Sequence, residues 1–402
     1  MDPKERYELT RRSVLDLTDL KEPEKVPSFI SIEAGWALKY AGVKWTDVEN
    51  DPEAFARAYC KCFAEIPIDL GVGYGPTRTT LRPAQLLGNN SFVYTADGAG
   101  ITHHQAADVY MGPEVYDEIM VDQEGLMNKR SLNNYKVFQG PRDAALAAVK
   151  EAGKAQVIAT ETMAKITEIL RDELGMFAMG GGFGGPSGGV YYGYVSEYWT
   201  FYDRLRGPQM ALSDLRRYPD KVEAACDFLY EQTKARMVYD EETMKQPLPV
   251  GNTMFHPESY LSPELFDKYY FKRFMEIMGP VMEAGKKVFL YGEGAFMKHL
   301  DRFRETPKGS MIIVLDQDDP FEANKIVGDW CTLVTGPKAE LLQLGTKQQV
   351  IDFVKRCFDE LAPGGGYIFG LGNGLITALD APVDNLVTAY ETAYELSTGG
   401  KA

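Results

Sequence analysis

The stretch AGKKVFLYGEG at residues 284–294 and the stretch PGGGYIFGLGNG at residues 363–374 decide the fold of this chain. Each contains a short apolar run that ends in glycine and a polar residue, Glu293 in the first and Asn373 in the second. Barrel enzymes present their functional groups in this way, because a buried strand is rigid and the chemistry lies where the strand meets a loop. The two stretches therefore predict barrel strands with site residues at their carboxyl ends.

Apolar runs alternate with helical patterns along most of the chain. Strands are predicted at residues 26–32, 66–74, 175–179, 249–255, 287–291, 311–315, 330–334 and 366–371. Helices are predicted between most of them, at residues 52–66, 143–174, 219–239, 262–284 and 347–361. Ser262 and Thr346 are expected to cap the last two helices. Eight strands that alternate with helices predict an α/β fold, a (β/α)₈ TIM barrel.

Residues 81–111 break this alternation. Within them, SFVYTADGAGITHHQAADVYM alternates Val, Tyr and Ile around an Asp-Gly turn, which predicts a β-hairpin. We interpret this segment as an excursion between early barrel strands that could act as a lid. The chain has no linker rich in Pro or Ser and no internal repeat, so residues 1–402 are expected to form a single barrel domain with an insertion at about 81–111.

The composition narrows the function classes. The 402 residues are 45% hydrophobic and 25% charged, which is typical of a large globular protein. A net charge of −15 argues against a nucleic-acid surface, which needs clustered Lys and Arg. The sequence has no apolar run long enough for a membrane span and no apparent secretion signal. Five cysteines without a disulfide framework indicate a reducing cytoplasm.

Imidazole, carboxylate and thiol groups are predicted near one barrel mouth. His256 follows the strand 249–255, Glu293 follows the strand 287–291, and Cys331 lies within the strand 330–334. If they converge, these three side chains would make a three-ligand Zn²⁺ site with an open fourth position, which could act as a Lewis acid. In the alternative interpretation, Glu293 and Asp316 cap loops by accepting backbone N–H groups.

The other histidines are weaker candidates. His103 and His104 are adjacent, so on a strand at most one of them faces a site. His299 lies in the helical pattern FMKHLDRF and is expected to be solvated.

The stretch MGGGFGGPSGGVYYGYVSEYW at residues 179–199 is a candidate substrate wall. It lacks the lysine of a phosphate-binding loop and the downstream acidic residue of a dinucleotide-binding turn. The glycines would let the backbone approach a flat ligand, and Tyr191, Tyr192 and Tyr194 could wall an aromatic pocket. The alternative is a surface loop followed by a packed aromatic cluster. Asn373 either binds substrate or supplies a left-handed turn.

These segments resemble the uroporphyrinogen decarboxylase superfamily, and within it the branch of corrinoid-dependent methyltransferases. The resemblance runs from about residue 27 to residue 393 and is strongest in DVYMGPEVYDEIMVD, RLRGPQMALSDLRRYPDKVEAACD, LSPELFDKYYFKRFMEIMGPVMEAGKKVFLYGEG and LAPGGGYIFGLGNGLITALDAPVDNL. MFHPES, LYGEG, LDQDDP and CTLVTGP are similar to segments of anaerobic methyltransferases found beside corrinoid proteins, O-demethylase components among them. The resemblance implies His256, Glu293, Asp316, Gln317 and Cys331 as site residues.

Two departures from the superfamily matter for function. Porphyrinogen decarboxylases have an arginine-rich N-terminal motif and a catalytic Asp in an FSDI segment, whereas the matching segments here read PSFISIEAGWALKY and PIDLGVGYGPTRT. Coenzyme M and chloromethane methyltransferases bind zinc through HxC and a distant Cys, where this chain has Tyr291-Gly292-Glu293 and Asn373. The resemblance therefore argues against porphyrinogen decarboxylation and against methyl transfer to a thiol.

The resulting hypothesis is a cytoplasmic methyltransferase that moves a methyl group from a small donor, such as an aryl methyl ether, to Co(I) of a separate corrinoid (cobalamin) protein. An acid or Zn²⁺ near Glu293 and His256 would stabilise the leaving oxygen. The expected catalytic residues are Glu293, His256 and Asp316. The expected substrate-binding residues are Tyr191, Tyr192, Tyr194, Asn373, Gln317 and His103.

Two alternatives stay open. The first is a cofactor-independent decarboxylase of another carboxylated substrate, and the second is a non-catalytic barrel that binds a corrinoid or tetrapyrrole. A homo-oligomer is compatible with each of these functions.

Overall fold

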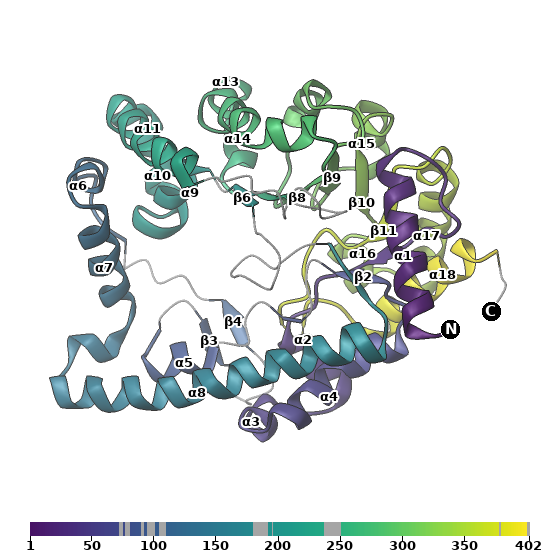
Figure 1. Cartoon of the computed structure of the whole chain (residues 1–402), viewed down its shortest axis with the longest axis horizontal. Coiled ribbons are helices and arrows are strands. Elements are labelled where there is room, and N and C mark those ends of the chain that lie inside the picture. Colours follow the sequence, from purple (N-terminus) through teal and green to yellow (C-terminus); the bar gives the residue numbers. More distant parts are fainter. Residues whose placement is uncertain are drawn as a thin grey trace.

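The computed structural model describes residues 1–71, 75–76, 81–89, 92–94, 101–103, 110–179, 192–194, 196–236, 251–377 and 379–399. Within these ranges nine parallel strands form one curled, barrel-like sheet in the order β5-β2-β1-β11-β10-β9-β8-β7-β6 (Figure 1). The strands are β1 (Ser28–Phe29), β2 (Leu70–Gly71), β5 (Phe177–Ala178), β6 (Tyr192–Tyr194), β7 (Gly251–Phe255), β8 (Val288–Gly292), β9 (Met311–Val314), β10 (Thr332–Thr335) and β11 (Tyr367–Gly370).

The predicted α/β barrel-like class and all eight predicted strands are confirmed. The ninth strand, β6, falls in the glycine- and tyrosine-rich stretch, where the glycines hide the apolar alternation that marks a strand. β5 and β6 stand at the two ends of the sheet, and no pairing joins them among the residues described.

Helices cover the outside of the curled sheet (Figure 1). They are α2 (Ala34–Ala41), α3 (Trp45–Val48), α4 (Pro52–Glu65), α9 (Glu197–Trp199), α10 (Pro208–Arg217), α11 (Pro219–Arg236), α13 (Pro263–Phe266), α14 (Lys272–Glu283), α15 (Pro320–Val327), α16 (Ala339–Leu344), α17 (Lys347–Leu361) and α18 (Val383–Ser397). π-helical turns at Thr200–Leu205 and Asp267–Phe271 continue α9 and α13. Short 3-10 helices follow β7 and β8, at Glu258–Tyr260 and Met297–Glu305. The predicted caps are confirmed: Ser262 accepts the Leu265 N–H, and Thr346 forms a capping box with Gln349.

The excursion between β2 and β5 is longer than predicted. It contains α5 (Leu81–Leu86), the antiparallel pair β3 (Phe92–Tyr94) and β4 (Ile101–His103), α6 (Val115–Val121), α7 (Gln123–Asn134), a 3-10 turn (Lys136–Gln139) and the 27-residue α8 (Arg142–Glu168), which a π-helical turn (Ile169–Glu173) extends. The predicted hairpin is confirmed by the pairing of Phe92 with His103. The assignment of residues 1–402 to a single domain stays a prediction.

Strand side chains alternate between the interior of the curl and the surrounding helix layer. Phe289, Tyr291, Ile312 and Val314 belong to an interior cluster, whereas their strand neighbours pack against the helices. None of the helices described is long and apolar enough to cross a membrane.

Helix α1 (Pro3–Thr18) closes the amino-terminal end of this interior. Its Val14 and Leu17 are fully buried in the interior cluster. The hydroxyl of Thr332, at the start of β10, donates to the Leu17 carbonyl at 3.0 Å, and Lys287, just before β8, donates to the Thr18 carbonyl at 3.2 Å. Within the described structure, α1 thus covers the amino-terminal end of the interior, opposite the carboxyl ends of the strands.

A buried carboxylate fixes the first two strands to each other. Asp69 is 2% exposed, pairs with Lys25 at 2.7 Å, and accepts the backbone N–H of Ser28 at 3.0 Å. Its position beside β1 and β2 links the start of the barrel to the segment that follows α1.

We expect Asp69→Ala to lower the free energy of unfolding by about 3 kcal/mol, because it leaves the half-buried Lys25 ammonium and the Ser28 N–H without their acceptor. Urea unfolding followed by circular dichroism measures the loss. Asp19→Asn is the control, because it alters a half-exposed pair with Lys287, and it should cost less than about 1 kcal/mol. Equal losses in the two variants would show that Asp69 does not hold the strands together.

Candidate active site

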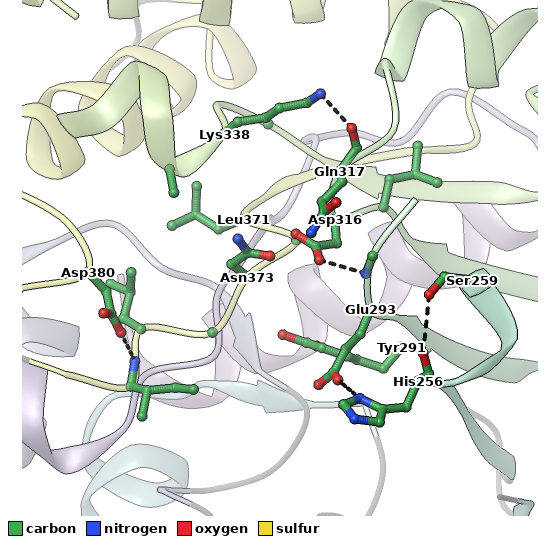
Figure 2. Close-up of a pocket in the computed structure, with 18 of the residues that line it drawn as sticks. His256, Ser259, Tyr291, Glu293, Asp316, Gln317, Lys338, Leu371, Asn373 and Asp380 are labelled. Carbon is green, nitrogen blue, oxygen red and sulfur yellow. Dashed lines mark hydrogen bonds and ion pairs between the residues drawn. The ribbon is translucent and has the colours of Figure 1, made fainter. Parts of the chain in front are cut away.

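A pocket of about 470 Å³ opens at the carboxyl ends of β8 to β11. Its size suits a small organic molecule. Figure 2 shows His256, Glu293 and Tyr291 on one side of the pocket and Leu371, Asn373 and Lys338 on the other. This is the end of the barrel that α1 leaves open, and it is where barrel enzymes hold their active sites.

The strand register brings the first site residues together. Phe255 is paired with Gly292, so the residues that follow them, His256 and Glu293, leave β7 and β8 side by side. The Glu293 N–H donates to the Phe255 carbonyl at 3.2 Å. Gly292 permits this packing, because a Cβ there would lie 2.1 Å from the Phe296 ring and 2.9 Å from the Val314 carbonyl oxygen.

His256 and Glu293 are hydrogen-bonded to each other. The distance from His256 Nδ1 to Glu293 Oε2 is 2.5 Å, and Nε2 lies 3.8 Å from Asp203 Oδ1. The Tyr202 ring stands edge-on to the imidazole with a centroid separation of 5.3 Å. The side chains of His256 and Glu293 are 31% and 38% exposed, so the pair remains accessible from the pocket mouth.

A second carboxylate anchors His256 from behind. Glu258 is 1% exposed, and its Oε2 accepts the backbone N–H of His256 at 2.8 Å. The Ser196 hydroxyl donates to the other oxygen of this carboxylate. Burial raises the pKa of Glu258, although these donors oppose the shift. Glu258 thus fixes the backbone from which the imidazole projects.

The surroundings favour the charged form of His256. Burial lowers the pKa of the imidazole, but the hydrogen bond to Glu293 and the negative charges of Glu293, Asp203 and Glu258 outweigh that effect. The net result is a pKa above the ordinary value for histidine. His256 and Glu293 therefore form an imidazolium–carboxylate pair that can hold or release a proton near neutral pH.

Asp316 follows β9 and supports the same loop. Its Oδ2 accepts the Gly294 N–H at 2.7 Å, and Gly294 has φ +86°, a conformation that favours glycine. The other oxygen, Oδ1, is buried and has no hydrogen-bond partner within the described structure. Burial raises the pKa of Asp316, and the charges of Glu293 and Asp318 add to the rise. The loop-capping interpretation holds for Asp316, whereas the Glu293 carboxylate is bonded to the His256 imidazole. Asp318, for which it was not proposed, accepts the N–H groups of residues 296 and 297.

Asn373 and Gln317 line the far side of the pocket, and their role in substrate binding stays a prediction. The Lys338 ammonium donates to the Gln317 carbonyl at 2.7 Å. Gly372 has no room for a side chain, because a Cβ would lie 1.9 Å from the Leu315 carbonyl oxygen. This close approach holds the loop that carries Asn373 against the end of β9.

Cys331 does not join His256 and Glu293. It precedes the first residue of β10, so the whole strand separates it from the pocket wall at Gly336. Its side chain is fully buried in the apolar layer outside the sheet, and burial raises the pKa of the thiol to about 12. The prediction that it is a metal ligand is wrong, because the strand begins one residue after Cys331.

The described residues at the mouth offer no three-ligand set for Zn²⁺. Among the residues described, no group of three or more His, Cys, Asp and Glu side chains could hold a metal ion. Nδ1 of His256 is engaged with Glu293, and the predicted thiolate lies elsewhere. Zinc binding through His256, Glu293 and Cys331 is therefore not supported.

The remaining predicted residues have varied outcomes. Tyr191 lies outside the described residues, and His103, Tyr192 and Tyr194 are described only as backbone in β4 and β6. His299 is fully buried rather than solvated: it stacks on Phe266 at 4.1 Å, and burial lowers its pKa to about 4.

Sequence reasoning missed several residues that shape the pocket. Tyr202 and Asp203 approach His256 from a π-helical turn, and Lys338 comes from the segment after β10. Glu258 could have been found, because it lies two residues after His256 in the quoted segment MFHPES.

Comparisons with known proteins agree with the barrel-like fold. No family model matches the chain, and no curated protein matches it in sequence. Among solved structures, a methyltransferase from Methanosarcina mazei matches with a TM-score of 0.54 over 96% of this chain and 98% of that chain, at 16% sequence identity. At this identity the likeness establishes the fold alone.

We expect the pKa of His256, measured by NMR titration of the imidazole protons, to lie above the ordinary value of about 6.5. Glu293→Gln should lower it, because the neutral amide no longer stabilises the imidazolium. The stabilisation that the pair contributes should be complete below pH of about 6.5 and be lost as the pH rises through the raised pKa. An unchanged titration midpoint in Glu293→Gln would contradict the charged pair.

Proposed function

We propose that this chain is a methyltransferase that takes a methyl group from a small donor in the carboxyl-end pocket and passes it to a corrinoid held by a partner protein. The observation that carries the proposal is the hydrogen-bonded His256–Glu293 pair at the accessible mouth of that pocket. The shared fold with a structure described as a methyltransferase supports it, as does the resemblance of the site segments to corrinoid-linked enzymes.

A reduced corrinoid would supply a strongly nucleophilic cobalt as the methyl acceptor. The pocket would hold the donor so that its methyl group points to the mouth, because methyl transfer needs close in-line approach. Glu293 and His256 are partly exposed at that mouth, where they can contact the atom from which the methyl group departs.

The pair can stabilise a leaving oxygen. If the donor is an aryl methyl ether, as the resemblance suggests, the electron pair of the broken carbon–oxygen bond stays on oxygen, and His256 can donate a proton to it. Glu293 keeps the imidazole oriented and favours its charged form. Asp316 holds the loop that carries Glu293.

Glu293→Gln should lower the methyl-transfer rate by about 10²-fold or more, because the imidazolium loses its partner. The unfolding free energy should change by about 0.5 kcal/mol or less, because the side chain is partly exposed. Single-turnover transfer to reduced cobalamin from a panel of methylated donors measures the rate.

Glu264→Gln is the matched control, since Glu264 is an exposed carboxylate outside the pocket, and it should keep the wild-type rate. A wild-type rate in Glu293→Gln would remove the pair from the mechanism. Failure of every donor with the wild-type protein would refute methyl transfer itself.

A further inference from the structure

The pocket mouth concentrates negative charge. Glu293 and Asp316 line it, and Asp203 lies beside His256 within 3.8 Å. Asp380 lines the opposite end, but its carboxylate is engaged with the N–H groups of Ile376 and Thr377. Asp380 therefore lies apart from Glu293 and Asp316, which stand on the His256 side of the pocket (Figure 2).

The basic groups beside these carboxylates include His256, and the Arg130 guanidinium interacts with Asp203. Of the pocket-lining residues described, Lys338 is the one Lys or Arg, and its ammonium is directed to the Gln317 carbonyl. The charges of Glu293, Asp318 and Glu340 add to burial in raising the pKa of Asp316, and all three are negative. The buried Asp316 Oδ1 also has no hydrogen-bond partner in the described structure. The carboxylates on this side of the pocket outnumber the His256 imidazolium and the Lys338 ammonium, so a ligand there meets a net negative field.

Aromatic rings border the same side. Tyr202, Tyr260 and Tyr291 line the pocket, and the Tyr202 and Tyr260 rings stack with centroids 6.2 Å apart. Tyrosine faces attract cations through the ring quadrupole, and sites that bind quaternary ammonium groups combine such rings with acidic groups. The far side has the apolar side chains of Leu342, Leu371 and Leu375 beside its polar groups, and these leucines suit the uncharged body of a ligand.

We infer that the methyl donor is a cation, of the quaternary ammonium class, whose charged head lies between the tyrosines and the carboxylates of Glu293 and Asp316. This inference rests on the proposed function and refines its donor. It favours an ammonium donor over the aryl methyl ether that the sequence resemblance suggests. A protonated His256 would compete with the bound cation for the same field.

The chemistry of such a donor balances without an acid. When the methyl group leaves, the carbon–nitrogen bond breaks and its electron pair stays on nitrogen, which becomes a neutral amine. The electron pair of the new bond to the methyl carbon comes from the reduced corrinoid acceptor. The carboxylates serve to bind and orient the donor. The Glu293 side chain is 38% exposed, so the ammonium head of a donor bound to it stays accessible from the pocket mouth.

Calorimetric binding to the full chain tests the inference with matched probes. Choline is compared with 3,3-dimethylbutan-1-ol, its neutral carbon isostere, and phenyltrimethylammonium is compared with methoxybenzene, an aryl methyl ether. Each cation should bind at least about tenfold more tightly than its neutral partner, which corresponds to about 1.4 kcal/mol. Equal or tighter binding of the neutral partner would overturn the inference.

Variants assign the effect to the named groups. Glu293→Gln and Asp316→Asn should each weaken cation binding about tenfold and leave the neutral probes unchanged, while Lys338→Gln should strengthen cation binding. Glu264→Gln is the control, since Glu264 is exposed and does not line the pocket, and it should change affinity less than about twofold. Cation affinities that none of the three pocket variants alters would overturn the inference.

Turnover separates this inference from the proposed function. Methylation of reduced cobalamin from phenyltrimethylammonium, but not from methoxybenzene, supports both. Transfer from methoxybenzene alone overturns the cationic donor and leaves methyl transfer standing. Tight, carboxylate-dependent binding of the cations without transfer from any donor refutes the methyltransferase and supports the assignment of the pocket to a cationic ligand.

Discussion

The parallel register of β7, β8 and β9 is the constraint on which the site depends. Phe255 lies opposite Gly292, and Tyr291 lies opposite Val314, so the residues after each strand emerge at one edge of the sheet. A slip of one residue would turn the inward side chains outward and separate His256 from Glu293. The glycine at 292 permits this register, because any larger residue would collide with the Phe296 ring.

Burial and exposure divide the barrel into a stable end and a functional end. Helix α1 seals the amino-terminal end with apolar side chains and two hydrogen bonds to its carbonyl groups. At the other end, His256 and Glu293 stay partly exposed while the buried Glu258 anchors the histidine backbone. Carboxylates that crowd one imidazole raise its pKa, and the same crowding makes the mouth attractive to cations. Acid–base character and ligand preference thus have one electrostatic origin.

Most of the fold could be predicted, because strand alternation, helical periodicity and caps such as Thr346 are local signals. His256, Glu293 and Asp316 could be assigned to one edge because parallel strands align their carboxyl ends. Cys331 was wrongly predicted as a metal ligand because an apolar pattern does not show where a short strand begins. Cys331 precedes the first residue of β10 and so lies at the amino-terminal end of the strand, away from the pocket. The burial of His299 arises from packing on Phe266, a contact between residues 33 positions apart that periodicity cannot reveal.

A crystal structure of the protein with phenyltrimethylammonium tests the central claim most directly. The account predicts the ligand in the carboxyl-end pocket, its ammonium head against Glu293, Asp316 and the tyrosine rings, with His256 still paired with Glu293. A ligand bound elsewhere, or His256 and Glu293 on separate surfaces with no cavity between them, would contradict it.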